Sequence, residues 1–262
     1  MKAEKRKVLS NQQVSERYWH MIVDASDLQI TAKPGQFFNV LCGESYYPLL
    51  RRPFSIYRIN KDSNTLEFLY LVKGIGTKQL ATIQAGDTVD IFGPLGNGFT
   101  LREEGGTILM LARGVGIATL AALAQEAAQQ GVRSVAILSA RTANDLLAAD
   151  ALQGFGAEVY KVTDEDGSSD VEQVRLLIER IMQEHSIQAA YTCGSKRLSM
   201  LLQEIAAGQD IFAEIALEEN MGCAMGVCFA CVCDIQDQDG ATRSVRVCKE
   251  GPVFALEQVV LS

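Results

Sequence analysis

Residues 222–233 read G-C-A-M-G-V-C-F-A-C-V-C, and one more cysteine, Cys248, follows Cys231 after sixteen intervening residues. The spacing is C-x4-C-x2-C-x16-C, formed by Cys223, Cys228, Cys231 and Cys248. Its first three positions match plant-type [2Fe–2S] sites, in which a bent loop and a distant strand bring four thiolates to two bridged irons. We therefore expect residues 216–262 to form a small C-terminal [2Fe–2S] domain that is stabilised by its metal.

Two other interpretations of the cysteines stay open. Cysteine also serves as a small buried apolar residue, although five of them between positions 223 and 248 are many for that role. A zinc site would use Cys228, Cys231, Cys233 and Cys248, but zinc sites of this kind usually carry a second C-x2-C pair, which is missing here. Cys233 alternates with Cys231 along a predicted strand over 231–235, so its side chain should point the other way and pack.

The composition is that of a folded, acidic protein. The 262 residues are 48% hydrophobic, and 24 Lys and Arg against 32 Asp and Glu give a net charge of −8. This charge disfavours nucleic-acid binding, which usually needs a basic face. No apolar run reaches the roughly 18 to 20 residues of a membrane span, and the basic start is not followed by the apolar core of a secretory signal. We expect a cytoplasmic protein with no membrane span, in which clustered cysteines bind metal.

Histidine is scarce, which excludes several kinds of catalytic site. His20 and His185 are the only two, and they lie far apart in the sequence. A Ser-His-Asp triad, a zinc hydrolase and a Rieske centre all need well-placed imidazoles. No candidate base and nucleophile set stands out elsewhere, so substrate chemistry is expected on another protein.

Upstream of the cysteines, residues 103–215 alternate short apolar runs with helical patterns. Strands are predicted at 107–112, 135–139, 158–162 and 189–193, and helices at about 117–130, 171–182 and 196–206. Strands that alternate with helices indicate a parallel sheet. We therefore expect a central α/β domain of the nucleotide-binding type.

Residues 1–102 contain short apolar runs separated by turn signals, which predicts a small antiparallel β-barrel or sandwich. The predicted strands cover 18–23, 37–42, 55–59, 66–72 and 88–92. The expected fold class is thus multi-domain α+β, with an N-terminal antiparallel β-barrel, the central α/β domain with its parallel sheet, and the cluster domain.

Two motifs in the β-rich part suit a ligand with a pyrophosphate and a flat ring. The stretch Arg51-Arg52-Pro53-Phe54-Ser55-Ile56 offers a guanidinium for a pyrophosphate, an aromatic surface and a hydroxyl for a flavin edge. The stretch Lys73-Gly74-Ile75-Gly76-Thr77 opens a predicted helix, where glycines let phosphate oxygens approach backbone N–H groups. Each motif alone is weak, because paired arginines usually lie on the surface and G-x-G-T is common.

Together the motifs resemble the ferredoxin–NADP reductase superfamily, whose flavin motif R-x-[YF]-[ST] matches residues 52–55. Within it, the chain is similar to the electron-transfer subunits of two-protein, NAD-dependent dihydroorotate dehydrogenases, which serve pyrimidine biosynthesis. The matching stretches are Arg51 to Ile56, G-P-L-G-N-G-F at 93–99, L-E-E-N-M at 217–221 and V-C-K-E-G-P-V-F at 247–254.

The resemblance implies FAD between the barrel and the α/β domain, and four ligands for the cluster. The implied FAD contacts are Arg52, Pro53, Phe54, Ser55, Leu69, Tyr70, Leu71, Gly76 and Thr77. The implied cluster ligands are Cys223, Cys228, Cys231 and Cys248. The resemblance also implies a catalytic flavoprotein dehydrogenase subunit as partner, in a heterotetramer.

The turn that opens the α/β domain departs from the family pattern G-G-G-I-G-x-x-P. Gly114 and Gly116 are kept, but Ala112 and Arg113 replace glycines and the proline is absent. The two glycines still allow a tight turn and an approaching nucleotide, so NAD(P)H remains an expected cofactor. Arg113 is open to three interpretations: it obstructs a nicotinamide, grips a phosphate or is a surface side chain. Cys193-Gly194 ends a later strand, where related reductases place residues beside the nicotinamide.

The sequence thus predicts an oxidoreductase subunit for electron transfer. A nicotinamide would exchange a hydride with FAD, FAD would exchange single electrons with [2Fe–2S], and the cluster would serve a partner dehydrogenase of the dihydroorotate type. The alternatives are a stand-alone NAD(P)H reductase for a ferredoxin or oxygenase, the electron-transfer subunit of a different flavin dehydrogenase, and a metal-binding scaffold without enzymatic activity.

Overall fold

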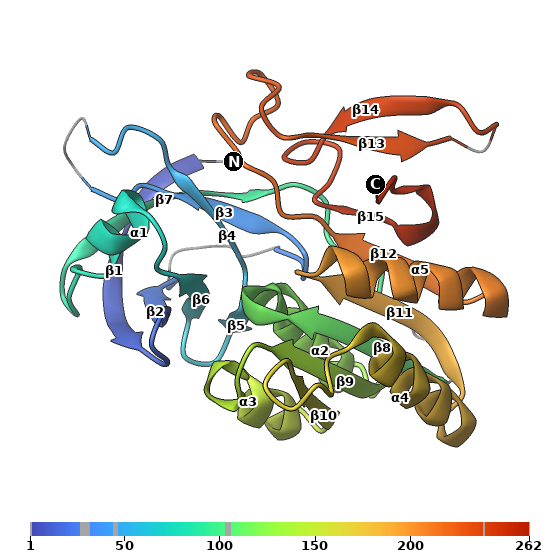
Figure 1. Cartoon of the computed structure of the whole chain (residues 1–262). Helices are drawn as coiled ribbons and strands as arrows, with labels where there is room; N and C mark the ends of the chain where they lie inside the picture. The colour runs from blue at the N-terminus through green and yellow to red at the C-terminus, as the bar shows by residue number, and fades with distance from the viewer. Residues whose placement is uncertain (1, 27–31, 44–46, 103–105, 238, 262) are drawn as a thin grey trace.

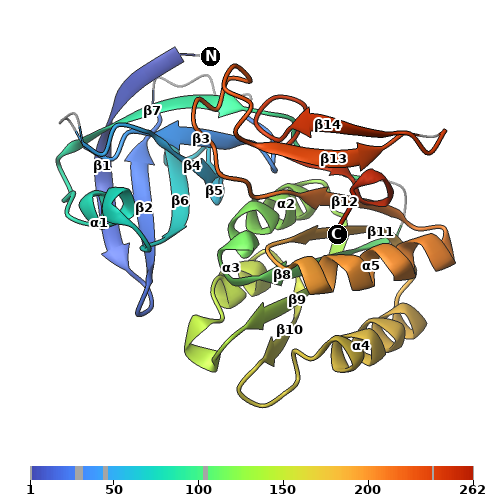
Figure 2. The same cartoon turned by 45° about the horizontal axis from the view of Figure 1, so that its top comes forward.

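The computed structural model of the chain describes residues 2–26, 32–43, 47–102, 106–237 and 239–261. Along the chain come a β-rich part, a sheet covered by helices, and a C-terminal segment with a β-hairpin (Figures 1 and 2). The expected multi-domain α+β fold is therefore confirmed.

The N-terminal part is a seven-stranded sheet in the order β4-β3-β7-β1-β2-β6-β5, with antiparallel pairing throughout. Its strands are β1 (Lys2–Gln13), β2 (Tyr18–Asp24), β3 (Phe37–Val40), β4 (Arg52–Ser55), β5 (Arg58–Asn60), β6 (Thr65–Leu71) and β7 (Thr88–Leu95). The sheet curls around a core that includes Phe38, Phe68 and Tyr70. The short helix α1 (Ile75–Leu80) lies between β6 and β7 in the chain.

Two details of this sheet differ from the sequence prediction. Strand β1 was not predicted, because its first half is charged and only Val8 of its described positions is buried. The predicted strand over 55–59 is wrong, since β4 ends at Ser55 and β5 begins at Arg58. Ile56 and Tyr57, between them, are both buried, the first in the barrel core and the second in the core shared with the α/β part.

The central sheet runs in the order β10-β9-β8-β11-β12-β15, and its first five strands are parallel. These strands are β8 (Thr107–Arg113), β9 (Arg133–Ala140), β10 (Glu158–Thr163), β11 (Ile187–Cys193) and β12 (Phe212–Ala216). The helices are α2 (Ile117–Gln129), α3 (Ala149–Gly154), α4 (Val171–Glu184) and α5 (Lys196–Gln209). Alternate residues of each strand face opposite cores, so α2 and α3 cover one face and α4 and α5 the other.

The C-terminal segment contributes to two sheets. Strands β13 (Val232–Gln236) and β14 (Thr242–Arg246) form an antiparallel hairpin, and β15 (Val253–Ala255) pairs antiparallel with β12. By sequence β15 belongs to the cluster domain expected at 216–262, but by hydrogen bonding it is the edge strand of the central sheet. A bridge between Asn97 and Pro252 joins the same segment to the N-terminal part.

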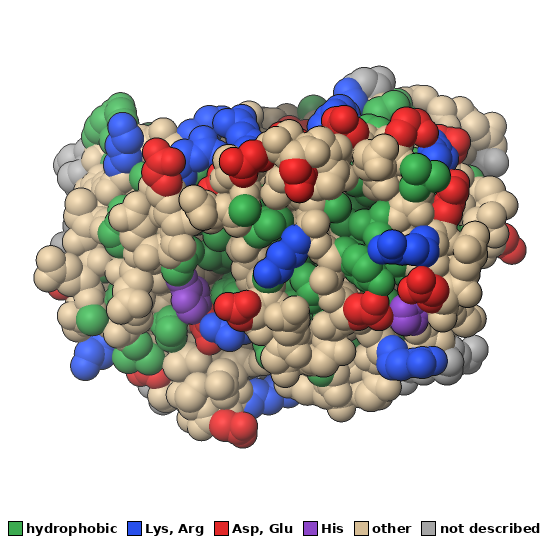
Figure 3. All heavy atoms as spheres, turned by 60° about the horizontal axis from the view of Figure 1, so that its bottom comes forward, with side chains coloured by type: hydrophobic (Ala, Val, Ile, Leu, Met, Phe, Trp, Pro, Cys, Tyr) green, Lys and Arg blue, Asp and Glu red, His purple; other side chains and the backbone are tan. Residues whose placement is uncertain are grey.

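Charges are mixed on the face drawn in Figure 3, where Lys and Arg stand among Asp and Glu rather than in one basic patch. Hydrophobic side chains show in the hollows of this face. Among the residues that the structure describes, no helix is long and apolar enough to cross a membrane.

Candidate functional site

A cavity of about 240 Å³ lies where all three parts of the chain meet. Strands β4 and β6 form one wall, the start of α2 forms another, and the segment after β12 closes the third side. Its lining residues are Phe37, Pro53, Phe54, Ser55, Leu69, Tyr70, Leu71, Val115, Ala118, Leu217, Glu218, Glu219, Met221 and Pro252. The structure thus gathers six of the residues predicted to contact FAD around one mostly apolar space.

The two neighbouring arginines have different surroundings. Arg51 Nη1 donates to the backbone oxygens of Asn39 and Asp90 and to the Asp90 carboxylate at 3.0 Å, so it braces the barrel. Arg52 Nη1 donates to the Leu50 carbonyl at 2.6 Å, and its guanidinium lies against Gly76 at the start of α1. A Cβ on Gly76 would come within 3.1 Å of Arg52 Nε. Arg52 and the start of α1 therefore lie together beside the cavity, as a pyrophosphate site requires.

Thr77, also predicted to contact FAD, shapes the start of α1. Its Oγ1 accepts hydrogen bonds from the backbone N–H groups of Lys73 at 2.9 Å and Gly74 at 3.2 Å. On strand β6, which precedes α1 in the chain, the Tyr70 hydroxyl donates to Asn11 Oδ1, and burial raises the pKa of this phenol. The Thr77 contacts fix the backbone at the start of α1, and the Tyr70 contact fixes the side chain of a residue that lines the cavity.

The glycine turn sits at the switch point of the parallel sheet, where β8 neighbours both β9 and β11. Gly114 has φ +56 and begins a short 3-10 helix over Gly114–Gly116. A Cβ on Gly116 would lie 2.7 Å from the Cys193 carbonyl oxygen, and one on Gly194 would lie 2.3 Å from the Arg113 carbonyl oxygen. The predicted nucleotide residues 114, 116, 193 and 194 are thus brought together at the carboxyl ends of adjacent strands, where open α/β sheets bind ligands.

Arg113 reaches across the end of β9 to β10. Its Nη1 donates to Ser139 Oγ at 2.7 Å and to Asp164 Oδ1 at 3.1 Å, and its Nη2 donates to Asp164 Oδ2 at 2.5 Å. The Arg113 guanidinium holds the pKa of the Asp164 carboxyl below its usual range. Arg113 is therefore an ion-paired side chain and not one that extends freely into solvent.

Glu218 is a cavity residue to which the sequence assigned no role. Cys193 Sγ donates to Glu218 Oε1 at 3.8 Å, which joins the end of β11 to the segment after β12. Burial raises the pKa of the Cys193 thiol. The only sequence signal was the match of residues 217–221 to the family, because a contact between positions 193 and 218 depends on the folded sheet.

The four predicted cluster ligands lie as two pairs. Backbone N–H groups of Met225, Val227 and Cys228 point at Cys223 Sγ from 3.3 to 3.4 Å, and the Cys223 N–H points at Cys228 Sγ. Burial raises the pKa of the Cys223 thiol, but the hydrogen bonds from these N–H groups outweigh it and lower the pKa to about 6. In the second pair, the Cys248 N–H donates to Cys231 Sγ at 3.4 Å. Donors aimed at sulfur suit thiolates that bind a cluster.

The spread of the sulfurs bears on the zinc alternative. A zinc ion with Zn–S bonds of about 2.3 Å needs four sulfurs roughly 3.8 Å apart. Among the described residues, no three cysteine sulfurs lie within 4.8 Å of one another. Cys233, which the zinc set required, lines a separate cavity with Lys196 and Ser199 of α5. The geometry favours two pairs, one for each iron, over one tetrahedral ion.

Apolar side chains are exposed around the first cluster pair. Met225, Val227 and Phe229 have 55%, 74% and 62% of their surface exposed, and Val232 follows on β13 with 43%. We call these four residues the cluster rim. Exposed apolar side chains gathered in this way are typical of a protein-binding surface.

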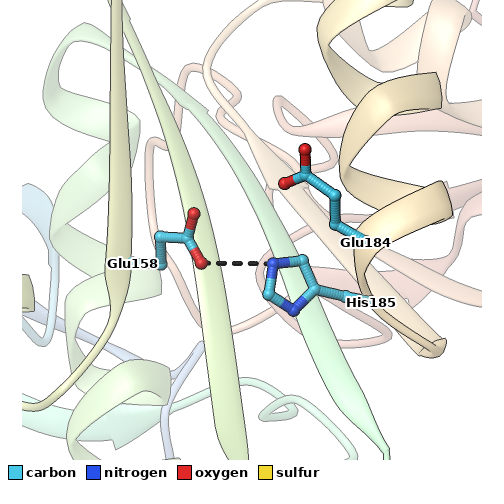
Figure 4. A group of neighbouring side chains, drawn as sticks. All are labelled: Glu158, Glu184 and His185. Carbon is cyan, nitrogen blue, oxygen red and sulfur yellow. Dashed lines mark ion pairs between the residues drawn. The ribbon is translucent and has the colours of Figure 1, made fainter.

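A second group of metal-ligating side chains joins β10 to the end of α4. Glu158 and Glu184 flank His185, and His185 Nε2 pairs with Glu158 Oε2 at 3.1 Å (Figure 4). The Tyr160 hydroxyl donates to the other oxygen of Glu158. These contacts explain the group as an ion pair on the edge strand β10. It lies at the other side of the sheet from the cavity residues.

Solved structures show which fold this is. The NADH-dependent reduced ferredoxin-NADP oxidoreductase, described for flavin-based electron bifurcation, matches with a TM-score of 0.81 at 22% identity, over 98% of this chain and 90% of its own. The ferredoxin-NADP+ reductase from Plasmodium falciparum matches with a TM-score of 0.66 at 12% identity, over 81% of this chain and 96% of its own. The chain has the ferredoxin–NADP reductase fold, with an added C-terminal segment.

The C-terminal segment and the whole sequence then give the family. The model of the iron-sulfur cluster binding domain of dihydroorotate dehydrogenase B matches residues 218–260. The electron transfer subunit of dihydroorotate dehydrogenase B (NAD(+)) from Desulforamulus reducens is 37% identical over 97% of both chains, and that from Bacillus caldolyticus is 35% identical over 98% of both. The chain belongs to the family of these electron transfer subunits.

Family membership settles several of the predictions. The resemblance found in the sequence is confirmed, and so is the role of the chain as an electron-transfer subunit of an oxidoreductase. The expected cofactor set of FAD, NAD and a [2Fe–2S] cluster is confirmed at the level of family and fold. A subunit of this family works with a catalytic partner subunit.

Proposed function

We propose that this chain carries electrons between NAD(H) and a catalytic flavoprotein dehydrogenase, through FAD at the cavity and a [2Fe–2S] cluster at the four cysteines. One observation carries the proposal: a single cavity is lined by the barrel, the glycine turn and the segment that leads to the cluster cysteines. FAD, when bound, supplies the conversion between a two-electron hydride and the single electrons that a cluster takes.

The barrel would hold the flavin nucleotide. Arg52 and the backbone at Gly76 and Thr77 would bind its pyrophosphate, since the guanidinium already lies against the start of α1. Pro53, Phe54 and Ser55 of β4 and the strand over 69–71 would flank its ring system. Phe54 packs against Tyr70 with ring centroids 5.2 Å apart, which gives this wall a rigid aromatic surface.

The nicotinamide nucleotide would bind at the switch point. The turn Gly114–Gly116 and the strand end Cys193-Gly194 would receive it on the side of α2 that faces the cavity. Glu218 and Cys193 share a hydrogen bond at this place, which would hold the strand end against the segment that follows β12.

The cluster would be bound by Cys223 and Cys228 on one iron and by Cys231 and Cys248 on the other. Support comes from the two sulfur pairs and from the backbone donors aimed at them. The cluster rim would then form the surface that contacts the partner, because its exposed apolar side chains surround the cysteines from which electrons would leave the chain.

The proposed partner is the catalytic subunit of a dihydroorotate dehydrogenase, in a heterotetramer of two chains of each kind. The names of the relatives support this partner. The cysteines that the structure describes form no disulfide bonds with one another, which supports a reducing compartment such as the cytoplasm. The glycine turn departs from the family pattern at Ala112 and Arg113, so a different flavin dehydrogenase is the second candidate for the partner.

The partner can be tested by reconstitution. The purified chain would be mixed anaerobically with the catalytic subunit of a dihydroorotate dehydrogenase B, and dihydroorotate-dependent reduction of NAD+ measured. We expect turnover that needs both proteins and that falls at least tenfold with the rim variants Val227→Glu and Phe229→Glu. Leu176→Glu, at an exposed apolar position of α4, is the matched control and should leave turnover unchanged. If the mixture shows no turnover, a different flavin dehydrogenase is favoured as the partner.

A further inference from the structure

Arg246 is joined to a predicted cluster ligand through one peptide group. Its Nη1 donates to the Gly226 carbonyl oxygen at 2.7 Å. The N–H of the same peptide group belongs to Val227, and it points at Cys223 Sγ from 3.3 Å. A cation on the carbonyl end of a peptide polarises it and strengthens the hydrogen bond made by its N–H end.

The surroundings of Arg246 hold its guanidinium in this position. Glu250 accepts from the Arg246 backbone N at 2.8 Å and from its Nε at 3.1 Å, and it also pairs with Nη2. The Phe229 ring covers the guanidinium, with 4.9 Å between Cζ and the ring centroid. The side chain of Arg246 is 24% exposed, so water screens its charge only in part.

The backbone of the loop is shaped to receive this contact. Gly226 has φ +80, a conformation that side chains rarely adopt. A Cβ there would come within 2.8 Å of Lys249 and 3.5 Å of Arg246 Nη1. Glycine at this position therefore lets the carbonyl turn toward Arg246 while the next N–H turns toward the sulfur.

We propose that Arg246 is a positioning residue that raises the reduction potential of the cluster through the Gly226–Val227 peptide, and that Glu250 offsets part of this effect. The proposal rests on the proposed function, since it needs a cluster at Cys223. Reduction adds one negative charge to the cluster, so a nearby cation and a stronger N–H···S bond favour the reduced state. Glu250 adds a negative charge beside the same guanidinium and acts in the opposite direction.

The test is a redox titration of the anaerobically purified full chain, followed by the EPR signal of the reduced cluster. Arg246→Gln should lower the reduction equilibrium constant about tenfold, which is about 59 mV for one electron. Glu250→Gln keeps the size of the side chain but removes its charge, and it should shift the potential upward. Arg243→Gln is the matched control on the same strand, because Arg243 pairs with the exposed Asp237 at 2.8 Å, away from the cluster loop. It should leave the potential unchanged.

Opposite shifts in the two variants separate this role from simple damage to the loop, which would shift both in one direction. The flavin potential in the same sample is the internal reference and should stay fixed. Shifts of one sign, or shifts no larger than that of Arg243→Gln, would overturn the proposal. If Arg246→Gln fails to retain its cluster, the upward shift in Glu250→Gln decides alone. Absence of a cluster from the unmodified chain would instead refute the proposed function.

Discussion

Gly116 and Cys193 approach so closely that no side chain fits between them. A Cβ on Gly116 would lie 2.7 Å from the Cys193 carbonyl oxygen and 2.8 Å from its carbonyl carbon. The neighbouring atoms are backbone, so they cannot rotate away. The glycine is therefore needed for packing of the turn against β11, whether or not a nucleotide is bound.

The first prediction concerns stability at this contact. Gly116→Ala should lower the free energy of unfolding by about 1 to 3 kcal/mol, the usual cost of overpacking, and should lower Tm in the absence of nucleotide. Gly208→Ala in α5 is the control, because a Cβ there meets nothing within 4 Å and alanine favours a helix. It should raise Tm slightly or leave it unchanged. Equal Tm values for the two variants would disprove the packing role.

The second prediction separates the two neighbouring arginines. Arg52→Ala removes the cation beside Gly76, and charged hydrogen bonds are each worth about 1.5 to 3 kcal/mol, so flavin should be lost on gel filtration while iron is retained. Arg51→Ala breaks the contacts to Asn39 and Asp90, so it should lower Tm and keep the flavin. Flavin absorbance and iron content per chain are the measurements. Full flavin occupancy in Arg52→Ala would rule out the assigned pyrophosphate site.

The third prediction concerns the cluster ligands. Cys228→Ser should remove the cluster, whereas Cys233→Ser should keep iron and acid-labile sulfide near two each per chain, the content of one [2Fe–2S] cluster. The reason is that Cys233 faces the cavity beside α5 and not the two sulfur pairs. Loss of metal from the Cys233 variant alone, or zinc in place of iron, would contradict the ligand set.

The fourth prediction concerns Arg113. The Asp164 carboxylate and Ser139 hold its guanidinium over the end of β9, beside the glycine turn, where it would meet a phosphate of the bound nucleotide. Arg113→Gly should raise the Kd for NADH about tenfold, equivalent to about 1.4 kcal/mol, and leave the rate of flavin reduction at saturation unchanged. Stopped-flow reduction at several NADH concentrations separates the two quantities. Faster reduction at saturation would mean that Arg113 obstructs the nicotinamide.

The sequence predicted what depends on local spacing, and it failed where distant residues meet. The C-x4-C-x2-C run, the R-P-F-S motif and the helix over Val171–Glu184 are each contained in one short segment, so their patterns were readable. Strand β15 was missed because three residues become a strand only when β12 offers its edge. The pairing of Arg113 with Asp164 and the contact of Cys193 with Glu218 likewise join residues from separate strands. No pattern within one segment carries such contacts.

The central claim is that electrons enter from a nicotinamide and reach the cluster through the flavin in this one chain. The direct measurement is anaerobic addition of NADH to the purified chain, with flavin absorbance and the EPR signal of the cluster followed in the same sample. We predict that NADH bleaches the flavin and that the reduced-cluster signal then appears, while Cys228→Ser shows the bleaching alone. If NADH and NADPH leave both centres oxidised although dithionite reduces both, the account is wrong.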